Sequence, residues 1–222
     1  MKIFASSDAL AESLADTVAA ALQARISRDG AAALAVSGGT TPLRFFTKLA
    51  TRDVNWAAVT VTLVDDRWVP ASSPRSNEGL VRQFLLQNKA AAARFLPLVN
   101  AAATPEDGRN AAHLAIAGLA LPLAAAVLGM GIDGHTASFF PGGDRLSAAL
   151  APADGAMVET MRTEAAVEPR ITLTLPVLLA AGYLALHIEG EAKRRVLETL
   201  SPLMPVAAVL VRQPAPDVFW SP

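Results

Sequence analysis

The stretch from Leu128 to Gly143, LGMGIDGHTASFFPGG, holds the residues best suited to chemistry. His135 stands two positions after Asp133 in a glycine-rich turn that follows an apolar run. Imidazole can take or release a proton near neutral pH, and a carboxylate can orient it. We interpret the two residues as a candidate catalytic pair, with an ordinary tight turn as the alternative. His113 and His187 have no comparable motif around them in the sequence. One histidine without a second imidazole offers few ligands for a metal ion, so no metal site is predicted.

A second candidate segment is SGGTTP, which begins at Ser37. Gly38 and Gly39 allow backbone N–H groups to approach a ligand, and Thr40 and Thr41 add hydroxyl donors just before an expected helix. Such a loop suits a phosphate group. The alternative is a tight turn in which Thr41 caps the helix. The segment lacks the lysine of a P-loop and the third glycine of a dinucleotide fingerprint, so neither nucleotide motif is present.

Charged residues follow a third strand, in the segment DDRWVP. Arg67 could hold an oxyanion with its fork of donors, or could form a surface ion pair with Asp65 or Asp66. Further along, Arg170 begins an expected strand, and Lys193 lies in the first turn of an expected helix, where a cation does not favour the helix dipole. An anionic ligand would explain Lys193, and a solvated lysine is the alternative.

The elements that must position these residues alternate between strands and helices. We expect a strand at Lys2–Phe4, a helix from Ser6 and Ser7 to Gly30, strands at Ala31–Val36, Val59–Val64 and Leu123–Leu128, a helix from the Ser76 cap to about Asn88, and, from Arg170 onward, a strand, a short helix, a strand and a helix from about Glu191. The turn GMGIDGHTAS is expected to lead into a short helix.

This alternation predicts an α/β fold, a three-layer α/β/α sandwich with a mostly parallel, Rossmann-like sheet covered by helices on both faces. We expect residues 1–222 to form a single domain. Ligands of such sheets bind outside the carboxyl ends of the strands. The three segments SGGTTP, DDRWVP and GMGIDGH should therefore converge at one edge of the sheet.

The composition narrows the class of protein. The chain has 222 residues, 52% of them hydrophobic and 18% charged, a formal net charge of −1 and no cysteine. This composition is typical of a globular protein. A net charge of −1 does not indicate nucleic-acid binding, and a chain without cysteine has no disulfide bonds. Asp8, Glu12 and Asp16 interrupt any signal-peptide core, and glycine and proline break the apolar stretch 114–132. We therefore expect a cytoplasmic protein that does not bind membranes.

Taken together, the motifs resemble those of the family that contains 6-phosphogluconolactonases and glucosamine-6-phosphate isomerases/deaminases. The segments VSGGTTP, VDDRWVP with SPRSNEG, LGMGIDGHTASFFPG, RITLTLPVL and GEAKRRVL follow the order and spacing of the family over nearly the whole chain. The resemblance is strongest to the lactonase branch. It implies hydrolysis of 6-phospho-D-glucono-1,5-lactone to 6-phospho-D-gluconate in the oxidative pentose phosphate pathway. An ester carbonyl is already electrophilic, so this reaction needs no cofactor and no metal.

The resemblance also implies residue roles. His135 would be the general base that activates water, Asp133 and Asp65 would orient it or bind sugar hydroxyls, and Arg67 would stabilise the oxyanion or anchor the phosphate. The substrate-binding residues would be Gly38, Gly39, Thr40, Thr41, Asp65, Asn77, Arg170 and Lys193. Among them, Gly39, Thr40 and Thr41 would form the phosphate-side loop, with Arg170 and Lys193 as further phosphate partners. The expected partner is a small sugar-phosphate lactone, bound by a monomer or small homo-oligomer.

The sequence departs from the family pattern at two places, and two other functions are alternatives to lactone hydrolysis. The strand LPLAAAV lacks the acidic residue expected near its start, and Glu78 stands where the family usually has an aromatic residue. The deaminase/isomerase branch needs an additional carboxylate near the histidine, yet no acid occurs between His135 and Asp144, and DDR stands where deaminases have an acid followed by tyrosine. A non-catalytic sugar-phosphate-binding protein would not need to keep both Asp133 and His135.

Overall fold

The computed structural model describes residues 1–222, and its centre is a sheet of seven parallel strands. In spatial order these are β1 (Lys2–Ile3), β10 (Asp217–Ser221), β9 (Tyr183–Glu189), β6 (Ala125–Leu128), β2 (Ala32–Val36), β3 (Val59–Leu63) and β5 (Arg94–Phe95). Strands β2 and β6 are fully buried, as expected for the middle of a parallel sheet with both faces covered.

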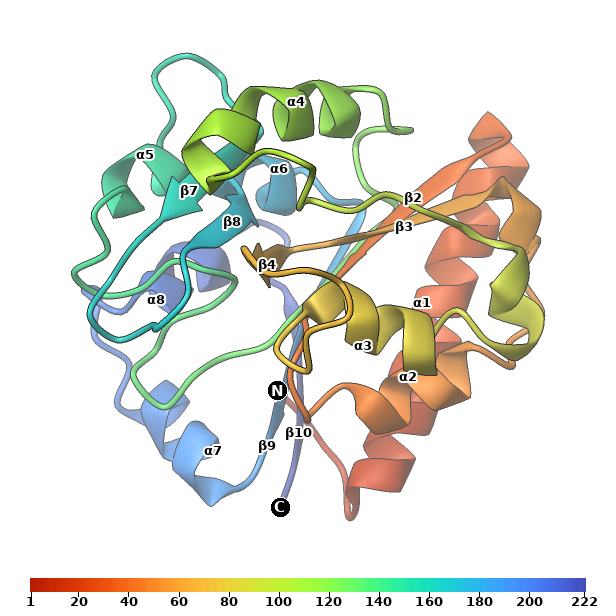
Figure 1. The fold of residues 1–222 in the computed structure, drawn as a ribbon. Helices are drawn as coiled ribbons and strands as arrows, with labels where there is room; N and C mark the ends of the chain where they lie inside the picture. The colour runs from red at the N-terminus through yellow and green to blue at the C-terminus, as the bar shows by residue number, and fades with distance from the viewer.

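Helices cover the two faces of this sheet. They are α1 (Ser7–Asp29), α2 (Leu43–Leu49), α3 (Asn77–Phe84), α4 (Pro105–Ala117), α5 (Leu146–Leu150), α6 (Leu175–Leu179), α7 (Glu191–Glu198) and α8 (Pro205–Leu210), with 3-10 turns at Trp56–Ala58 and Asn88–Ala92. Figure 1 shows α1 and α2 on one side of the sheet and α5, α6 and α8 on the other. The α/β class predicted from the sequence is confirmed. No helix is long and apolar enough to cross a membrane.

Helix α1 forms where the sequence places its signals. The Ser6 hydroxyl accepts a hydrogen bond from the N–H of Ala9 at 3.2 Å, and Gly30 ends the helix in the left-handed conformation with φ 79°. Buried residues such as Leu14 and Val18 recur at helical spacing and face the core. Local sequence alone therefore determines both ends of this helix.

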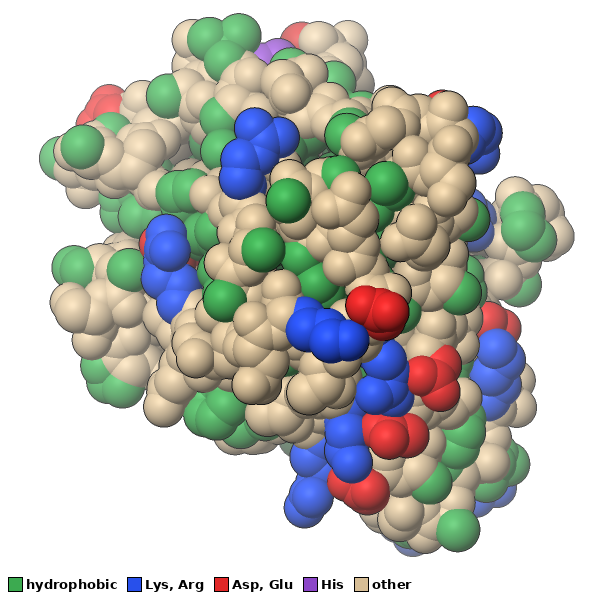
Figure 2. Space-filling model, turned by 90° about the vertical axis from the view of Figure 1, so that its right-hand side faces the viewer, with side chains coloured by type: hydrophobic (Ala, Val, Ile, Leu, Met, Phe, Trp, Pro, Cys, Tyr) green, Lys and Arg blue, Asp and Glu red, His purple; other side chains and the backbone are tan.

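On the molecular surface, ion pairs join α1 to α2 and to the turn that follows α2. Lys48 lies 3.4 Å from Asp8, and Arg52 lies 3.1 Å from Glu12 and 2.7 Å from Asp16. Figure 2, which shows this side of the molecule, has basic and acidic side chains interleaved in its lower right part. Because exposed pairs contribute at most about 1 kcal/mol each, the buried apolar face of α1 matters more for stability.

A second, antiparallel sheet was not predicted. It consists of β4 (Asp65–Arg67), β8 (Arg170–Leu173) and β7 (Val158–Met161). The sequence predicted DDRWVP as a loop at a strand end, and this part of the prediction is wrong. A strand of three residues is too short to show an alternating pattern, and it forms because the tertiary structure pairs Asp65 with Thr172 and Arg67 with Arg170.

Three further local predictions are wrong. Pro42, not Thr41, occupies the N-cap position of α2, and no side chain caps that helix. Helix α3 ends at Phe84, short of Asn88. The turn after Asp133 leads into an isolated bridge between Thr136 and Phe139, and the next helix begins only at Leu146. Short-range sequence patterns place the ends of elements only to within a few residues.

The order of the strands determines where a ligand can bind. From β2 the chain proceeds to β3 and β5 on one side, and then returns to β6, β9 and β10 on the other. The loops that follow β2 and β6 diverge at this switch point and leave a crevice. The predicted convergence of SGGTTP, DDRWVP and GMGIDGH at one edge of the sheet is confirmed, because β3, β2 and β6 are neighbours.

Asp66 connects the second sheet to helix α3. Its carboxylate is 1% exposed and accepts hydrogen bonds from the backbone N–H groups of Arg67 (2.8 Å), Asn77 (2.7 Å) and Glu78 (3.1 Å). Burial raises the pKa of Asp66 to about 6, although the N–H donors oppose the shift and the nearby Asp65 adds to it. The carboxylate anchors the start of α3 beside the crevice.

We expect the substitution Asp66→Asn to flatten the pH dependence of stability. The folded-state pKa of about 6 lies above the ordinary value of 3.8, so the folded protein binds the proton more tightly. Asp66 therefore makes the free energy of unfolding fall as pH rises from about 4 to about 6, by roughly 3 kcal/mol. Urea denaturation across this range measures the effect.

The control is Asp53→Asn, because Asp53 is 97% exposed and pairs only with Lys89 at the surface. This variant should follow the wild-type profile. If Asp66→Asn also followed it, the burial of Asp66 would not control the pH dependence.

Candidate functional site

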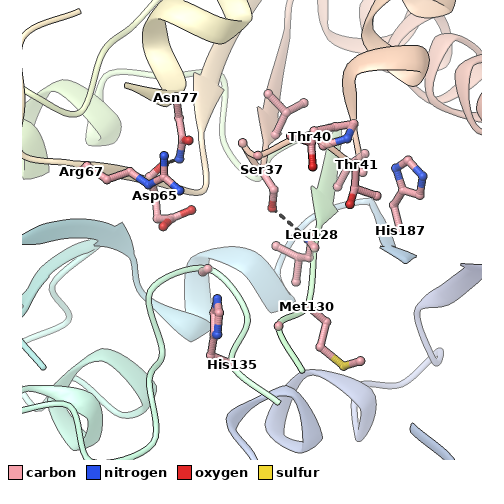
Figure 3. A pocket seen from close by; sticks show the side chains of 18 of the residues that line it. Ser37, Thr40, Thr41, Asp65, Arg67, Asn77, Leu128, Met130, His135 and His187 are labelled. Carbon is pink, nitrogen blue, oxygen red and sulfur yellow. Dashed lines mark hydrogen bonds between the residues drawn. The ribbon is translucent and has the colours of Figure 1, made fainter. Parts of the chain in front are cut away.

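A cavity of about 380 Å³ opens at the carboxyl ends of β2, β3 and β6 (Figure 3). Its lining includes the predicted site residues Gly38, Gly39, Thr40, Thr41, Asp65, Arg67, Asn77, His135, Arg170 and Lys193. The structure thus brings together residues that are up to 155 positions apart, from Gly38 to Lys193. Asp133 does not line the cavity itself and lies beside His135.

Asp133 and His135 form a hydrogen-bonded pair. Oδ1 of Asp133 lies 2.6 Å from Nδ1 of the imidazole, and the same oxygen accepts from the backbone N–H of His135 at 3.2 Å. A side chain at Gly131 would overlap both members, so glycine is required there. An ionised carboxylate on Nδ1 favours the tautomer that carries its proton on that atom. Nε2 is then available to accept a proton.

Phe140 packs against His135 and fixes one side of the imidazole. The two ring centroids are 4.5 Å apart, and the rings are tilted by 34°. The phenyl ring reaches this position because the chain reverses at Ala137, which adopts φ 50°, in the left-handed region that only glycine occupies easily. Thr136 secures the turn by donating to the carbonyl of Gly129 at 2.7 Å. Local backbone strain therefore lies directly beside the imidazole.

Asp65 has a different role from Asp133. Its carboxylate accepts from the Ser138 hydroxyl at 2.6 Å, and its backbone carbonyl accepts from Nδ2 of Asn77 at 2.8 Å. No hydrogen bond joins it to His135. Oδ1 of Asn77 is buried and has no partner, and a side chain at Gly38 would overlap this amide. Asp65 ties together the walls of the cavity, while Asp133 alone orients the imidazole.

Two arginines share one end of the cavity. Arg67 and Arg170 are paired in register on β4 and β8, and the Nε atom of each is buried without a partner. Nη1 of Arg67 donates to the carbonyl of Arg75 at 2.5 Å, and the Arg170 guanidinium lies over the ring of Phe140. Burial lowers the pKa of Arg170, and the nearby Asp65 carboxylate opposes the shift. Two guanidinium groups with unused donors can bind an anion or an oxyanion.

Lys193 lies with the SGGTTP loop. Its ammonium donates to the Thr41 hydroxyl at 3.3 Å. Burial lowers the pKa of Lys193, and the Glu189 carboxylate opposes the shift. In Figure 3, Thr40, Thr41 and His187 lie across the cavity from Arg67, Asp65 and Asn77. The cations that the resemblance grouped together are thus divided, Arg170 with Arg67 and Lys193 with Thr41.

Sequence reasoning did not assign a role to Ser37, Phe140 or His187, which also line the cavity. Ser37 links the loops after β2 and β6, because its hydroxyl accepts from the N–H of Gly129 at 2.9 Å. Phe140 confines His135, and His187 lines the wall beside Thr41 although it lies on a buried strand. The serine could have been noticed as the polar residue that directly follows β2. The importance of the other two depends on neighbours from distant segments.

The donors around the cavity suit an anionic ligand. They comprise guanidinium, ammonium, hydroxyl and amide groups, which bind phosphate and carboxylate oxygens. No group of three or more histidine, aspartate, glutamate or cysteine side chains is arranged to hold a metal ion. The acid–base pair and the anion-binding groups therefore open onto the same cavity.

Comparisons with known proteins show the family of this chain. Residues 5–220 match the family model described as glucosamine-6-phosphate isomerases/6-phosphogluconolactonase. The chain is 50% identical to a 6-phosphogluconolactonase of Rhizobium meliloti, an alignment that covers 100% of this chain and 98% of the relative.

Solved structures of members of this family have the same fold as this chain. A 6-phosphogluconolactonase from Shewanella baltica superimposes with a TM-score of 0.96 at 40% identity, covering 100% of this chain and 97% of the other. A monomeric glucosamine-6-phosphate deaminase shares the fold with a TM-score of 0.73 at 18% identity, covering 100% of this chain and 96% of the other. The chain belongs to the glucosamine-6-phosphate isomerase/6-phosphogluconolactonase family.

Proposed function

We propose that this protein hydrolyses 6-phospho-D-glucono-1,5-lactone to 6-phospho-D-gluconate, with His135 as the general base. The observation that carries the proposal is the 2.6 Å contact between Asp133 and His135 at a cavity lined by cations. A base held in one tautomer can take a proton from water, and nearby guanidinium groups can stabilise negative charge. The 6-phosphogluconolactonase relatives support the same substrate.

The reaction can be written through these groups. Nε2 of His135 takes a proton from water as the oxygen attacks the lactone carbonyl carbon, and the carbonyl electrons move onto its oxygen. Arg67 and Arg170 stabilise this oxyanion. When the tetrahedral intermediate collapses, the ring C–O bond breaks, and His135 returns the proton to the departing ring oxygen. The intermediate collapses to the open-chain carboxylic acid, which releases its proton to solvent and leaves as the carboxylate with its phosphate unchanged.

The phosphate group occupies the other end of the cavity in this proposal. Lys193, the Thr40 and Thr41 hydroxyls and the N–H groups of Gly38 and Gly39 form that end. Phosphate contacts far from the reacting carbon hold the carbonyl against His135. This placement assigns oxyanion stabilisation to the arginines and phosphate binding to the lysine.

The surroundings of His135 favour lactone hydrolysis over the deaminase/isomerase reaction. Ring opening and proton transfer between two carbons call for an additional carboxylate near the histidine. Here only Asp133 hydrogen-bonds to His135, and the Phe140 ring packs beside it. Ammonia release from glucosamine 6-phosphate, without acceleration of lactone hydrolysis, would support the deaminase reaction instead.

We expect His135→Ala to lower kcat for the phosphorylated lactone by roughly a hundredfold to ten-thousandfold, the usual contribution of a general base. The lactone is generated in situ, 6-phosphogluconate is followed with its dehydrogenase, and the spontaneous hydrolysis rate is subtracted. His113→Ala is the control, because His113 lies outside the cavity lining. Near-normal kcat in His135→Ala would refute the assignment of the base.

We expect Lys193→Ala to raise KM about tenfold or more while kcat stays within a few-fold of wild type, since the lysine contacts the phosphate and not the reacting carbon. The same coupled assay measures both constants. Arg195→Ala is the matched control, because Arg195 lies on the same helix and is exposed. A fall in kcat at unchanged KM would place Lys193 at the reacting carbonyl instead.

A further inference from the structure

His187 is a buried histidine whose role the reaction above leaves open. It lies on β9, is 2% exposed and lines the cavity next to Thr41 (Figure 3). Its ring packs edge-on against Phe45, with centroids 6.3 Å apart. Nδ1 is buried and has no hydrogen-bond partner. An unpartnered polar atom in the wall of a binding cavity is costly unless a ligand satisfies it.

Glu189 determines which ring nitrogen of His187 carries the proton. Its Oε1 lies 3.1 Å from Nε2 of the imidazole, and its Oε2 accepts from the Ser7 hydroxyl at 2.9 Å. The hydrogen bond from His187 is the main reason why the pKa of Glu189 is lowered, so the carboxylate is ionised. Nε2 therefore donates to Glu189, and Nδ1, which has no partner to which it could donate, presents a lone pair.

Before substrate binds, one negative charge and two positive charges lie at and around this pair, which leaves a net charge of +1. Glu189 is opposed by Lys193 on α7 and by Arg44 on α2, the other charged groups that act on the pair. A phosphate dianion that arrives at Lys193 would meet both the Glu189 charge and the Nδ1 lone pair. One added proton on Nδ1 removes the repulsion, because His187 and Glu189 then form a neutral ion pair and Nδ1–H becomes a donor.

On the basis of the lactone hydrolysis proposed above, we propose that His187 binds the substrate phosphate and takes up one proton from solvent in doing so. In the complex Nε2–H donates to Glu189 and Nδ1–H donates to a phosphate oxygen. No covalent bond changes, and the proton returns to solvent when the product leaves. His187 thus adds to Lys193 a second cation that exists only when the phosphate is bound.

Calorimetry with 6-phosphogluconate tests this proposal. Titrations in two buffers of different ionisation enthalpy give the number of protons taken up on binding. We expect wild type to take up more protons than His187→Phe, and we expect the variant to bind 6-phosphogluconate about tenfold or more weakly. Equal proton uptake in the two proteins would overturn the proposal, whatever the change in affinity.

Two further variants separate phosphate binding from packing. The amide of Asn lies as many bonds from Cα as Nδ1 does, whereas the amide of Gln reaches the place of Nε2. We expect His187→Asn to keep part of the affinity and His187→Gln to lose as much as His187→Phe. If His187→Gln bound 6-phosphogluconate more tightly than His187→Asn, only the contact with Glu189 would matter for affinity. His113→Phe, away from the cavity, is the control and should bind like wild type.

The lactonase assay is run on the same preparations. If wild type bound 6-phosphogluconate but failed to accelerate lactone hydrolysis, the proposed function would fail while calorimetry still decided the role of His187. If wild type hydrolysed the lactone and His187→Phe showed wild-type KM, His187 would have no contact with the phosphate. Failure of wild type to bind 6-phosphogluconate would overturn the inference about His187.

Discussion

The parallel pairing of β2 with β6 is the constraint on which the site depends. The N–H of Ser37 donates to the carbonyl of Val127 at 3.0 Å, and the Ser37 hydroxyl accepts from the N–H of Gly129 at 2.9 Å. These contacts hold the SGGTTP loop against the turn that carries Asp133 and His135. Since the chain leaves β2 in one direction and returns to β6 from the other, the cavity forms between the two loops. A shift in this register would separate His135 from the SGGTTP loop.

The second sheet provides the other wall of the cavity and explains its charge. Strands β4 and β8 set Arg67 opposite Arg170, two cations that would repel each other without a compensating anion. Asp65 lies nearby and is held by Ser138. The next residue, Asp66, points to the opposite side of the strand. Its carboxylate anchors α3 by accepting hydrogen bonds from backbone N–H groups. Adjacent aspartates on a strand therefore serve opposite faces, one toward the cavity and one toward the fold.

The arginine end and the lysine end of the cavity hold their positive charges in different ways. At the arginine end the charge is permanent, because guanidinium does not lose its proton in proteins, and such a charge suits an oxyanion that exists only briefly. At the lysine end Glu189 opposes the positive charge of Lys193 before the ligand arrives. Partial neutralisation lowers the cost of burying these groups in the free protein. The division agrees with a substrate that carries its fixed charge far from the carbon that reacts.

The sequence by itself determined the alternation of strands and helices, the ends of α1 and the pairing of Asp133 with His135, because each depends on residues within a few positions of one another. The α/β class and the convergence of three loops followed from the direction of parallel strands. Only the tertiary structure decided that Asp65–Arg67 form a strand, that Arg170 lies with Arg67 and away from Lys193, and that His187 and Phe140 belong to the cavity. These features depend on contacts between distant segments, for which a local pattern carries no signal.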